Sequence, residues 1–284
     1  MTLTGAGKVA GVIGWPIAHS VSPALHGYWL RELHVDGALV PLAVARENFA
    51  RVIRALQQAG FQGVNVTVPH KEAAFALADQ TDGAAKAAGA ANLLIFHANG
   101  RIEARNTDMV GLRDSLREKL GGLEGRTVIL LGAGGAARGA VLALNELGAA
   151  RVHILNRHLG KAHTLARALA PMVKSELLPG DLKDWAEMAG DADLLVNATS
   201  AGMKGHPSLA LDLAGLRASA AVLDIVYNPL ETELLKNAKT RGHTAIDGLG
   251  MLMHQAVPSF EAFFGVRPKV TPGLRALLEQ ILHA

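Results

Sequence analysis

Short runs of apolar residues alternate with amphipathic segments along the N-terminal part of the chain. The runs at residues 9–13, 39–44 and 63–68 predict strands, and the segments 23–33 and 47–59 predict the helices between them. Strands that alternate with helices are typical of a parallel sheet. The sequence therefore predicts an α/β fold for this part of the chain.

The sequence next predicts a hairpin, because residues 92–96 and 102–105 are short strand candidates joined by a segment that contains Asn99-Gly100. The hairpin leads into Asn106-Thr107-Asp108, and residues 109–120 then predict a helix. This helix is the expected crossover into a second part of the fold.

The second half of the chain repeats the alternation of buried strands and helices. The predicted strands comprise residues 127–131, 152–155, 193–196, 221–226 and 244–246. Runs that are apolar on both faces indicate a parallel sheet covered by helices on both sides, which is a doubly wound fold. The remaining residues, from Gly248 to Phe264 and from Pro272 to His283, are predicted to be helical and to return to the first part.

The composition agrees with an α/β enzyme and excludes several other classes. The 284 residues suffice for two domains, 50% of them are hydrophobic, and there is no cysteine for disulfide or thiolate chemistry. A net charge of +3 gives no strong field for nucleic acid. The twelve histidines show no metal-binding spacing. The start lacks the pattern of a signal peptide, and no apolar run is long enough for a membrane span, so we expect a soluble, cytoplasmic protein.

A glycine-rich turn between a predicted strand and a predicted helix indicates a dinucleotide site. The turn follows the pattern G-x-G-x-x-A and comprises Gly132, Ala133, Gly134, Gly135, Ala136 and Ala137. Gly132 can adopt a backbone conformation that other residues avoid, and Gly134 lets a pyrophosphate approach the main chain. The free N–H groups of the following helix would face that anion. Glycines also form ordinary turns, so the motif indicates a dinucleotide site mainly because a predicted strand precedes it and a predicted helix follows it.

The residues after the second strand of this part favour NADP over NAD. An NAD site usually has Asp or Glu there to bind the ribose 2′-hydroxyl, whereas this chain has Asn156-Arg157-His158. The planar guanidinium of Arg157 suits a phosphate. The alternative is a solvated surface arginine.

Polar residues near the predicted strand ends of the first part are candidates for a substrate site. Ser22 before Pro23 predicts a helix N-cap with proline at the first helical position. Ser20 and Ser22 could hold a carboxylate there, or Ser22 could only cap the helix. Asn65 and Thr67 alternate with valines, so they should share a face that lines a polar cleft.

Lys71 follows the third predicted strand and opens a helix. Open α/β sheets place ligands at the carboxyl ends of their strands. From spacing alone, however, such a lysine is more often solvated than catalytic.

The chain resembles the shikimate dehydrogenase family in seven motifs that follow the family's order over nearly the whole chain. They are Ser20-Val-Ser22-Pro23, Asn65-Val-Thr67-Val-Pro-His-Lys71, Asn106-Thr107-Asp108, Gly132-Ala-Gly134-Gly-Ala-Ala-Arg138, Asn197-Ala-Thr-Ser-Ala-Gly-Met203, Asp224-Ile-Val-Tyr227-Asn-Pro229 and Gly248-Leu-Gly250-Met-Leu-Met-His-Gln255. The resemblance implies reversible NADPH-dependent reduction of 3-dehydroshikimate to shikimate, within aromatic amino acid biosynthesis. It also implies a substrate-binding domain of residues 1–108 plus 248–284 and a Rossmann domain of residues 109–247.

The resemblance also implies roles for single residues. Lys71 and Asp108 would be the catalytic pair and would contact the substrate. Ser20 and Ser22 would bind the substrate carboxylate. The ring hydroxyls would be held by Asn65, Thr67, Asn92 and Gln255, with Tyr227 close to the substrate and the nicotinamide. The implied cofactor contacts are Gly132, Ala133, Gly134, Gly135, Ala136, Ala137, Asn156, Arg157, His158, Thr199, Ser200, Val226 and Gly248.

Three positions depart from the family's usual residues. Leu93 and Met109 stand where threonine and glycine are common, which bears on substrate preference. His158 replaces a threonine or serine near the adenosine half of the cofactor.

Three other functions stay open. The first is a quinate-oxidising branch that uses NAD, which Arg157 argues against. The second is an idle sensor that binds NADP and a ring acid, which the presence of both Lys71 and Asp108 argues against. The third is a folate-linked dehydrogenase, which lacks the paired serines. We expect small-molecule ligands only, no metal, and a monomer or homodimer.

Overall fold

The chain forms two compact units in the computed structural model, which describes residues 3–283. Unit 1 contains residues 3–107 and 253–283, and unit 2 contains residues 108–252. The predicted boundary after residue 108 lies one residue later than the boundary between the units in the structure. The predicted boundary after residue 247 lies five residues earlier than the second one. The second crossing falls within helix α10 (Leu249–Phe264), whose first turn packs in unit 2: a Cβ at Gly250 would lie 2.5 Å from Ser115 Oγ.

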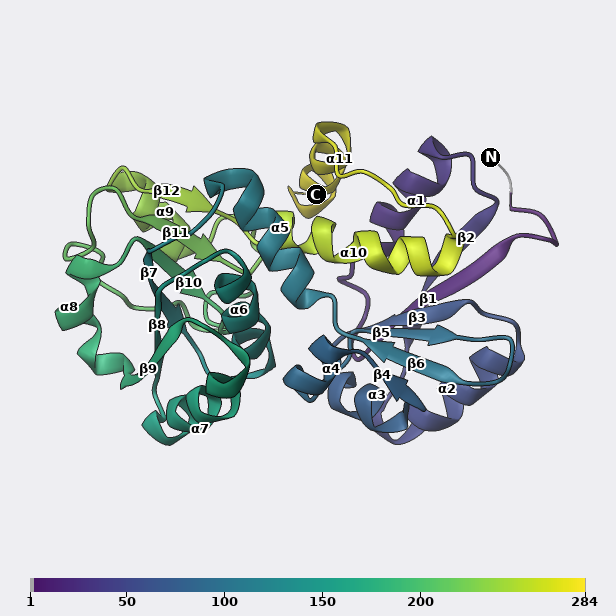
Figure 1. Cartoon of the computed structure of the whole chain (residues 1–284). Helices are drawn as coiled ribbons and strands as arrows, with labels where there is room; N and C mark the ends of the chain where they lie inside the picture. Colours follow the sequence, from purple (N-terminus) through teal and green to yellow (C-terminus); the bar gives the residue numbers. More distant parts are fainter. Residues whose placement is uncertain (1–2, 284) are drawn as a thin grey trace. The chain divides into compact units, whose positions relative to one another are not determined.

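Unit 1 contains a mixed sheet with the strand order β2-β1-β3-β5-β6-β4 (Figure 1). The strands are β1 (Lys8–Gly14), β2 (Gly37–Ala43), β3 (Gly63–Val66), β4 (Gln80–Thr81), β5 (Leu93–Phe96) and β6 (Ile102–Arg105). β1 pairs in parallel with β2 and β3, as predicted. β5 and β6 form the predicted antiparallel hairpin, and Gly100 in its turn has a φ of 82°. The short strand β4 was not predicted.

Helices cover both faces of this sheet. They are α1 (Ser22–Glu32), α2 (Phe49–Gln58), α3 (Lys71–Leu77), α4 (Gly83–Ala88), the later part of α10, and α11 (Pro272–His283). The cluster on one face joins Phe49 and Ile53 of α2 with Val64 and Leu94 of the sheet. Trp29 of α1 packs edge-on against Phe260 of α10, with ring centroids 5.5 Å apart.

Unit 2 is a doubly wound fold with six parallel strands in the order β12-β11-β10-β7-β8-β9. The strands are β7 (Thr127–Leu131), β8 (Arg151–Asn156), β9 (Glu176–Asp181), β10 (Leu194–Asn197), β11 (Ala221–Asp224) and β12 (Thr244–Ile246). This is the order of dinucleotide-binding folds, so the predicted Rossmann architecture is confirmed. β9 was missed because Pro179 and Gly180 interrupt it, and an edge strand tolerates both.

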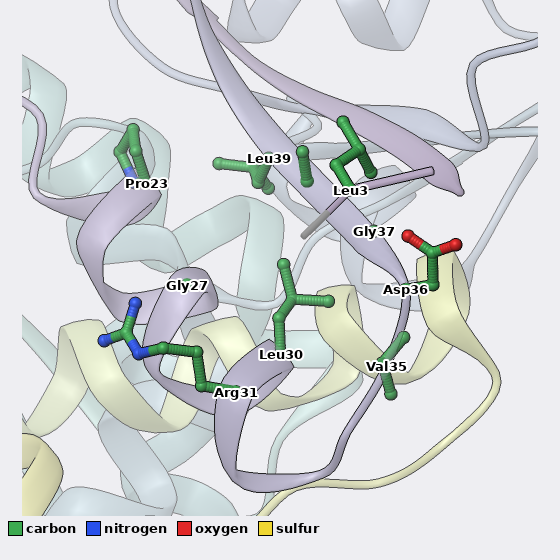
Figure 2. A pocket seen from close by; sticks show the side chains of 10 residues that line it. Leu3, Pro23, Gly27, Leu30, Arg31, Val35, Asp36, Gly37 and Leu39 are labelled. Carbon is green, nitrogen blue, oxygen red and sulfur yellow. The ribbon is translucent and has the colours of Figure 1, made fainter. Parts of the chain in front are cut away.

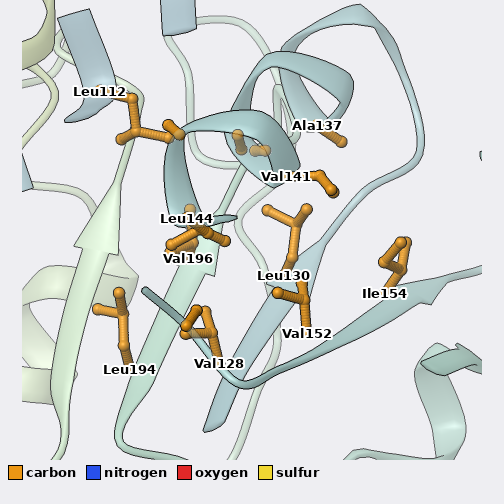
Figure 3. Close-up of a cluster of buried hydrophobic side chains, with 14 of the residues drawn as sticks. Leu112, Val128, Leu130, Ala137, Val141, Leu144, Val152, Ile154, Leu194 and Val196 are labelled. Atoms are coloured by element: carbon orange, nitrogen blue, oxygen red, sulfur yellow. The ribbon is translucent and has the colours of Figure 1, made fainter. Parts of the chain in front are cut away.

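Apolar side chains fill both faces of the sheet in unit 2. Figure 3 shows one face, where Val128 and Leu130 of β7 meet Val141 and Leu144 of α6 (Gly135–Glu146). Ile129 and Leu131 belong to the cluster on the opposite face. The other helices of the unit are α5 (Asp108–Leu120), α7 (Leu159–Leu169), α8 (Trp185–Met188) and α9 (Glu233–Thr240). No helix in residues 3–283 is both long and apolar enough to cross a membrane.

Candidate active site

Ser20 and Ser22 lie at the start of α1, which begins one residue earlier than predicted. Leu25 N donates to Val21 O at 3.0 Å, and the helix begins at Ser22, so Pro23 takes its second position. Val21 is therefore the N-cap, and the prediction that Ser22 is the N-cap with Pro23 at the first helical position is wrong. Ser20 Oγ accepts a hydrogen bond from Ser22 N at 3.4 Å. Capping consequently does not explain the hydroxyl of Ser22.

Thr67 lies in the turn after β3 rather than in the strand. The predicted strand continued to residue 68, but β3 ends at Val66 because the chain turns, and His70 N donates to Thr67 O at 3.0 Å. The Thr67 methyl would lie 2.5 Å from a Cβ at Gly14, so only glycine fits at the end of β1. Asn65 and Thr67 both keep partly accessible side chains at this carboxyl edge.

One end of the Asn65 side-chain amide has a partner and the other has none. The amide nitrogen lies 3.4 Å from His26 Nε2, and the amide oxygen is buried without a hydrogen-bond partner among the described residues. Either orientation of this amide leaves one of its polar ends unpaired among the described residues. Buried polar atoms in folded proteins are normally paired, so this amide is suited to a ligand hydroxyl.

His26 is a neighbour of the site that the sequence did not single out. It is fully buried and packs against Trp29, Phe260 and Phe263. Burial lowers the pKa of its imidazole from 6.5 to about 3, so the ring is neutral in the folded protein at physiological pH. Its position four residues after Ser22 on α1 is the signal that could have indicated this placement.

The low pKa of His26 should make the protein less stable in mild acid. The unfolded chain takes up a proton as the pH falls below 6.5, whereas the folded protein does not until about pH 3. Between pH 7 and pH 5 we expect a loss of roughly 2 kcal/mol in unfolding free energy from this residue. Urea unfolding of the wild type and of His26→Gln at both pH values measures it, and only the wild type should show this loss.

A control for this experiment is His34→Asn, which alters an exposed histidine with a φ of 53° that asparagine tolerates. It should retain the pH dependence of the wild type. An unchanged pH dependence in His26→Gln would contradict the assignment.

Asn92, Thr107 and Gln255 form a polar cluster within unit 1. Asn92 Nδ2 donates to Gln255 Oε1 at 2.9 Å, and Asn92 Oδ1 accepts from Thr107 N at 2.8 Å. Thr107 Oγ1 lies 3.0 Å from Asn92 Nδ2. Thr107 was part of a recognised motif but was not predicted as a site residue. The cluster joins the start of β5, the end of β6 and α10, so it holds two of the predicted hydroxyl-binding side chains together.

The two predicted catalytic residues each begin a helix. Lys71 is the first residue of α3, and its carbonyl accepts from Ala91 N at 2.9 Å. Asp108 is the first residue of α5. Both side chains are partly accessible. They belong to different units, so their pairing stays a prediction.

Two of the positions that depart from the family's usual residues contribute to packing. Leu93 is fully buried in the sheet of unit 1. Met109 packs against the hydrophobic cluster of unit 2.

The glycine-rich turn in unit 2 has the geometry that an anion site requires. Gly132 has a φ of 111°, and a Cβ there would lie 3.1 Å from the Thr199 methyl. Gly134 is the N-cap of α6, and a Cβ at Gly134 or Gly135 would meet no described atom within 4 Å. Ala133 and Ala136 are partly accessible, whereas Ala137 is buried in the core. The first N–H groups of this helix have no intrahelical acceptor, so they can bind a pyrophosphate.

Arg157 follows β8 and is exposed with no ion pair to any described residue. Asn156 Nδ2 donates to His158 O at 3.1 Å, which shapes this turn. His158 is the N-cap of α7 but makes no side-chain capping bond. No carboxylate stands in the turn. These features fit NADP, because a cationic side chain can bind its 2′-phosphate and no carboxylate in the turn would repel that phosphate.

The ends of β10 and β11 carry the remaining predicted cofactor residues. Thr199 and Ser200 follow β10, and Val226 and Tyr227 follow β11. A Cβ at Gly248 would lie 2.2 Å from Ile225 O, so only glycine allows this backbone approach. Burial raises the pKa of the Tyr227 hydroxyl, so it stays protonated near neutral pH.

A separate pocket of about 250 Å³ in unit 1 lies between α1 and β2 (Figure 2). Leu30 and Leu39 line it together with Arg31 and Asp36. Its lining residues include none of the predicted site.

The six-stranded doubly wound sheet, with its glycine-rich turn and an arginine after the second strand, is the structure of a dinucleotide-binding oxidoreductase. Family models match three segments of the chain. They are described as the shikimate dehydrogenase substrate binding domain over residues 12–94, shikimate/quinate 5-dehydrogenase over residues 114–207, and the shikimate 5′-dehydrogenase C-terminal domain over residues 248–278.

Individual relatives agree with these matches. A protein of Methylobacterium radiotolerans named shikimate dehydrogenase (NADP(+)) is 52% identical, over 93% of this chain and 94% of the relative. One of Paramagnetospirillum magneticum with the same name is 48% identical, over 97% and 99%. A crystal structure of a shikimate dehydrogenase in complex with NADP+ superposes with a TM-score of 0.89 at 32% identity, covering 99% of this chain and 98% of that one. The chain belongs to the shikimate dehydrogenase family, which confirms the resemblance.

Proposed function

We propose that this protein catalyses the reversible NADPH-dependent reduction of 3-dehydroshikimate to shikimate, a step of aromatic amino acid biosynthesis. The observation that carries the proposal is the 48% identity, over 97% of the chain, to a relative named for this activity and cofactor. The residues support it independently. Serine hydroxyls, three side-chain amides and a lysine suit a small ring that carries hydroxyls and one carboxylate.

The roles of the residues follow from the charge changes in the reaction. When bound, NADPH supplies the hydride that reduces the ring ketone. The ammonium group of Lys71 stabilises the negative charge that develops on the ketone oxygen and donates a proton to it. Asp108 orients Lys71 and accepts a hydrogen bond from a substrate hydroxyl. The amides of Asn65, Asn92 and Gln255 bind hydroxyls and fix the ring in position.

The glycine-rich turn and the start of α6 would hold the pyrophosphate of the cofactor, and Arg157 would bind its 2′-phosphate. The loops after β10 and β11 would flank the cofactor with Thr199, Ser200, Val226 and Tyr227. We further propose that the protein works in the cytoplasm, where this cofactor is found, as a monomer or homodimer. Size-exclusion chromatography with light scattering distinguishes the two oligomeric states.

A spectrophotometric assay tests the function directly. Shikimate oxidation is followed with NADP+ and with NAD+, and quinate serves as the competing substrate. We expect turnover of shikimate with NADP+. Preferred oxidation of quinate with NAD+ would instead identify the quinate branch, and ligand binding without turnover would identify a sensor.

Replacing both Ser20 and Ser22 by alanine should raise the KM for shikimate at least about tenfold and lower kcat much less. The substrate carboxylate is remote from the reacting carbon, so its hydrogen bonds stabilise the ground state and the transition state alike. Steady-state kinetics and thermal melting of the double variant measure both effects.

Ser259→Ala, which removes a buried hydroxyl elsewhere in unit 1, is the matched control for stability. A collapse in melting temperature with an unchanged KM in the surviving protein would show that Ser20 and Ser22 are structural only.

A further inference from the structure

A fully buried carboxylate lies at the end of β11 in unit 2. Asp224 is 0% exposed, and three neutral groups donate hydrogen bonds to it. Asn197 Nδ2 and Val226 N donate to Oδ1 at 2.9 and 3.1 Å, and Thr232 Oγ1 donates to Oδ2 at 2.7 Å. Burial raises the pKa of this carboxyl, and the three donors act in the opposite direction. The carboxylate thus joins groups from three different segments.

The first segment is the loop after β10, which folds around the side chain of Asn197. Asn197 Oδ1 accepts from Thr199 N at 3.1 Å and from Thr199 Oγ1 at 2.7 Å. Asn197 Nδ2 also donates to Ala201 O at 3.3 Å, and Ala201 N donates to Thr199 Oγ1 at 3.1 Å. Because Asp224 holds the amide of Asn197, it indirectly fixes the orientation of Thr199.

The other two segments are the loop after β11 and the start of α9. Val226 directly precedes Tyr227 in the loop after β11, and its backbone N–H donates to Asp224. Thr232 is the N-cap of α9, where its Oγ1 also accepts from Leu235 N at 3.4 Å. A Cβ at Gly202 would lie 3.5 Å from Thr232, so this side chain also lies near the loop after β10.

We propose that Asp224 is a positioning residue for the cofactor, acting through Asn197, Val226 and Thr232 to hold the loops after β10 and β11 in one fixed arrangement. This inference rests on the proposed function, which places the cofactor against Thr199 and Tyr227. Only a carboxylate offers acceptors at both oxygens, so it can hold both loops and the helix start at once.

Stability alone is a poor explanation for this carboxylate. Taking a charge out of water is costly, and neutral donors compensate for it only in part. A buried carboxylate at the cofactor edge of the sheet is better explained by the geometry that it imposes on the loops. A positioning role and a purely structural role therefore predict different outcomes for the same substitutions.

Four variants separate the two roles. Asp224→Asn keeps the size of the side chain but removes one acceptor. Thr232→Val keeps the shape and removes both the donor to Asp224 and the acceptor for Leu235 N, and Thr232→Ser restores both. Ser175→Ala is the matched control, because Ser175 is a buried hydroxyl of the same unit that donates to Ala149 O at 2.6 Å, just before β9 begins and thus at the opposite edge of the sheet.

Three measurements are made on each full-length variant: the Kd for NADP+, the melting temperature, and amide hydrogen exchange of the cofactor-free protein. In Asp224→Asn and Thr232→Val we expect the Kd to rise about fivefold or more. Exchange should quicken in residues 198–203 and 225–229, and the Kd should rise more than in Ser175→Ala for the same loss in melting temperature. Thr232→Ser should be close to the wild type.

A Kd within twofold of the wild type in both Asp224→Asn and Thr232→Val would overturn the positioning role. The positioning role would also be overturned if Ser175→Ala raised the Kd for NADP+ as much as Asp224→Asn and Thr232→Val do for the same loss in melting temperature. If Asp224→Asn does not fold, Thr232→Val decides alone, because it leaves the carboxylate in place. Failure of the wild type itself to bind NADP+ would overturn the proposed function instead, so the two failures are distinguishable.

Discussion

Lys71→Ala is expected to lower kcat for shikimate oxidation by about a hundredfold or more, with the KM for shikimate changed by less than about tenfold. Lys71 opens α3 beyond the carboxyl end of β3, the edge where open α/β sheets bind their ligands. Its ammonium acts on charge that exists mainly in the transition state, so its loss affects turnover more than binding. Steady-state kinetics at saturating NADP+ measure both constants.

Asp108→Asn should have the same effect as Lys71→Ala, since both residues serve the same proton transfer. Lys86→Ala is the matched control, because Lys86 is an exposed lysine of unit 1 on α4, outside the predicted site. It should leave both constants unchanged. Near-normal turnover in Lys71→Ala or Asp108→Asn would show that the catalytic assignment is wrong.

The strands were largely predictable from local sequence patterns. β7 and β10 contain continuous apolar runs because helices cover both faces of the sheet, and that pattern is visible without any tertiary information. The hairpin of β5 and β6 was predictable because Asn99-Gly100 fits a tight turn. β9 escaped prediction because its edge position allowed a proline and a glycine.

The site was predictable as a set of residues but not as a set of contacts. His26 and Asn65 are 39 residues apart and Asn92 and Gln255 are 163 apart, so no local pattern indicates that they meet. The placement of Ser22 was wrong by one position because a proline is tolerated throughout the first turn of a helix, so Pro23 does not fix the residue at which the helix begins. The motif containing Asp224 was recognised, yet its buried bonds to Asn197 and Thr232 depend on the packing of three segments.

Arg157→Ala should weaken the use of NADP roughly ten- to a hundredfold and that of NAD hardly at all. Arg157 is exposed, pairs with no acid in residues 3–283, and follows β8 where NAD enzymes usually carry a carboxylate. A hydrogen bond from its guanidinium to the 2′-phosphate should contribute about 1.5–3 kcal/mol, and every 1.4 kcal/mol corresponds to about a factor of ten. Comparison of kcat/KM for the two cofactors in wild type and variant measures the preference.

Two further variants complete this experiment. Asn156→Asp should move the preference further toward NAD, since an aspartate would meet the phosphate with like charge. It also removes the donor to His158 O, so its melting temperature is measured alongside. Arg167→Ala, an exposed arginine in the last turn of α7, should leave the preference unchanged. Equal losses for NADP and NAD in Arg157→Ala would show that this arginine does not bind the 2′-phosphate, and the cofactor preference would then have to arise elsewhere in the turn.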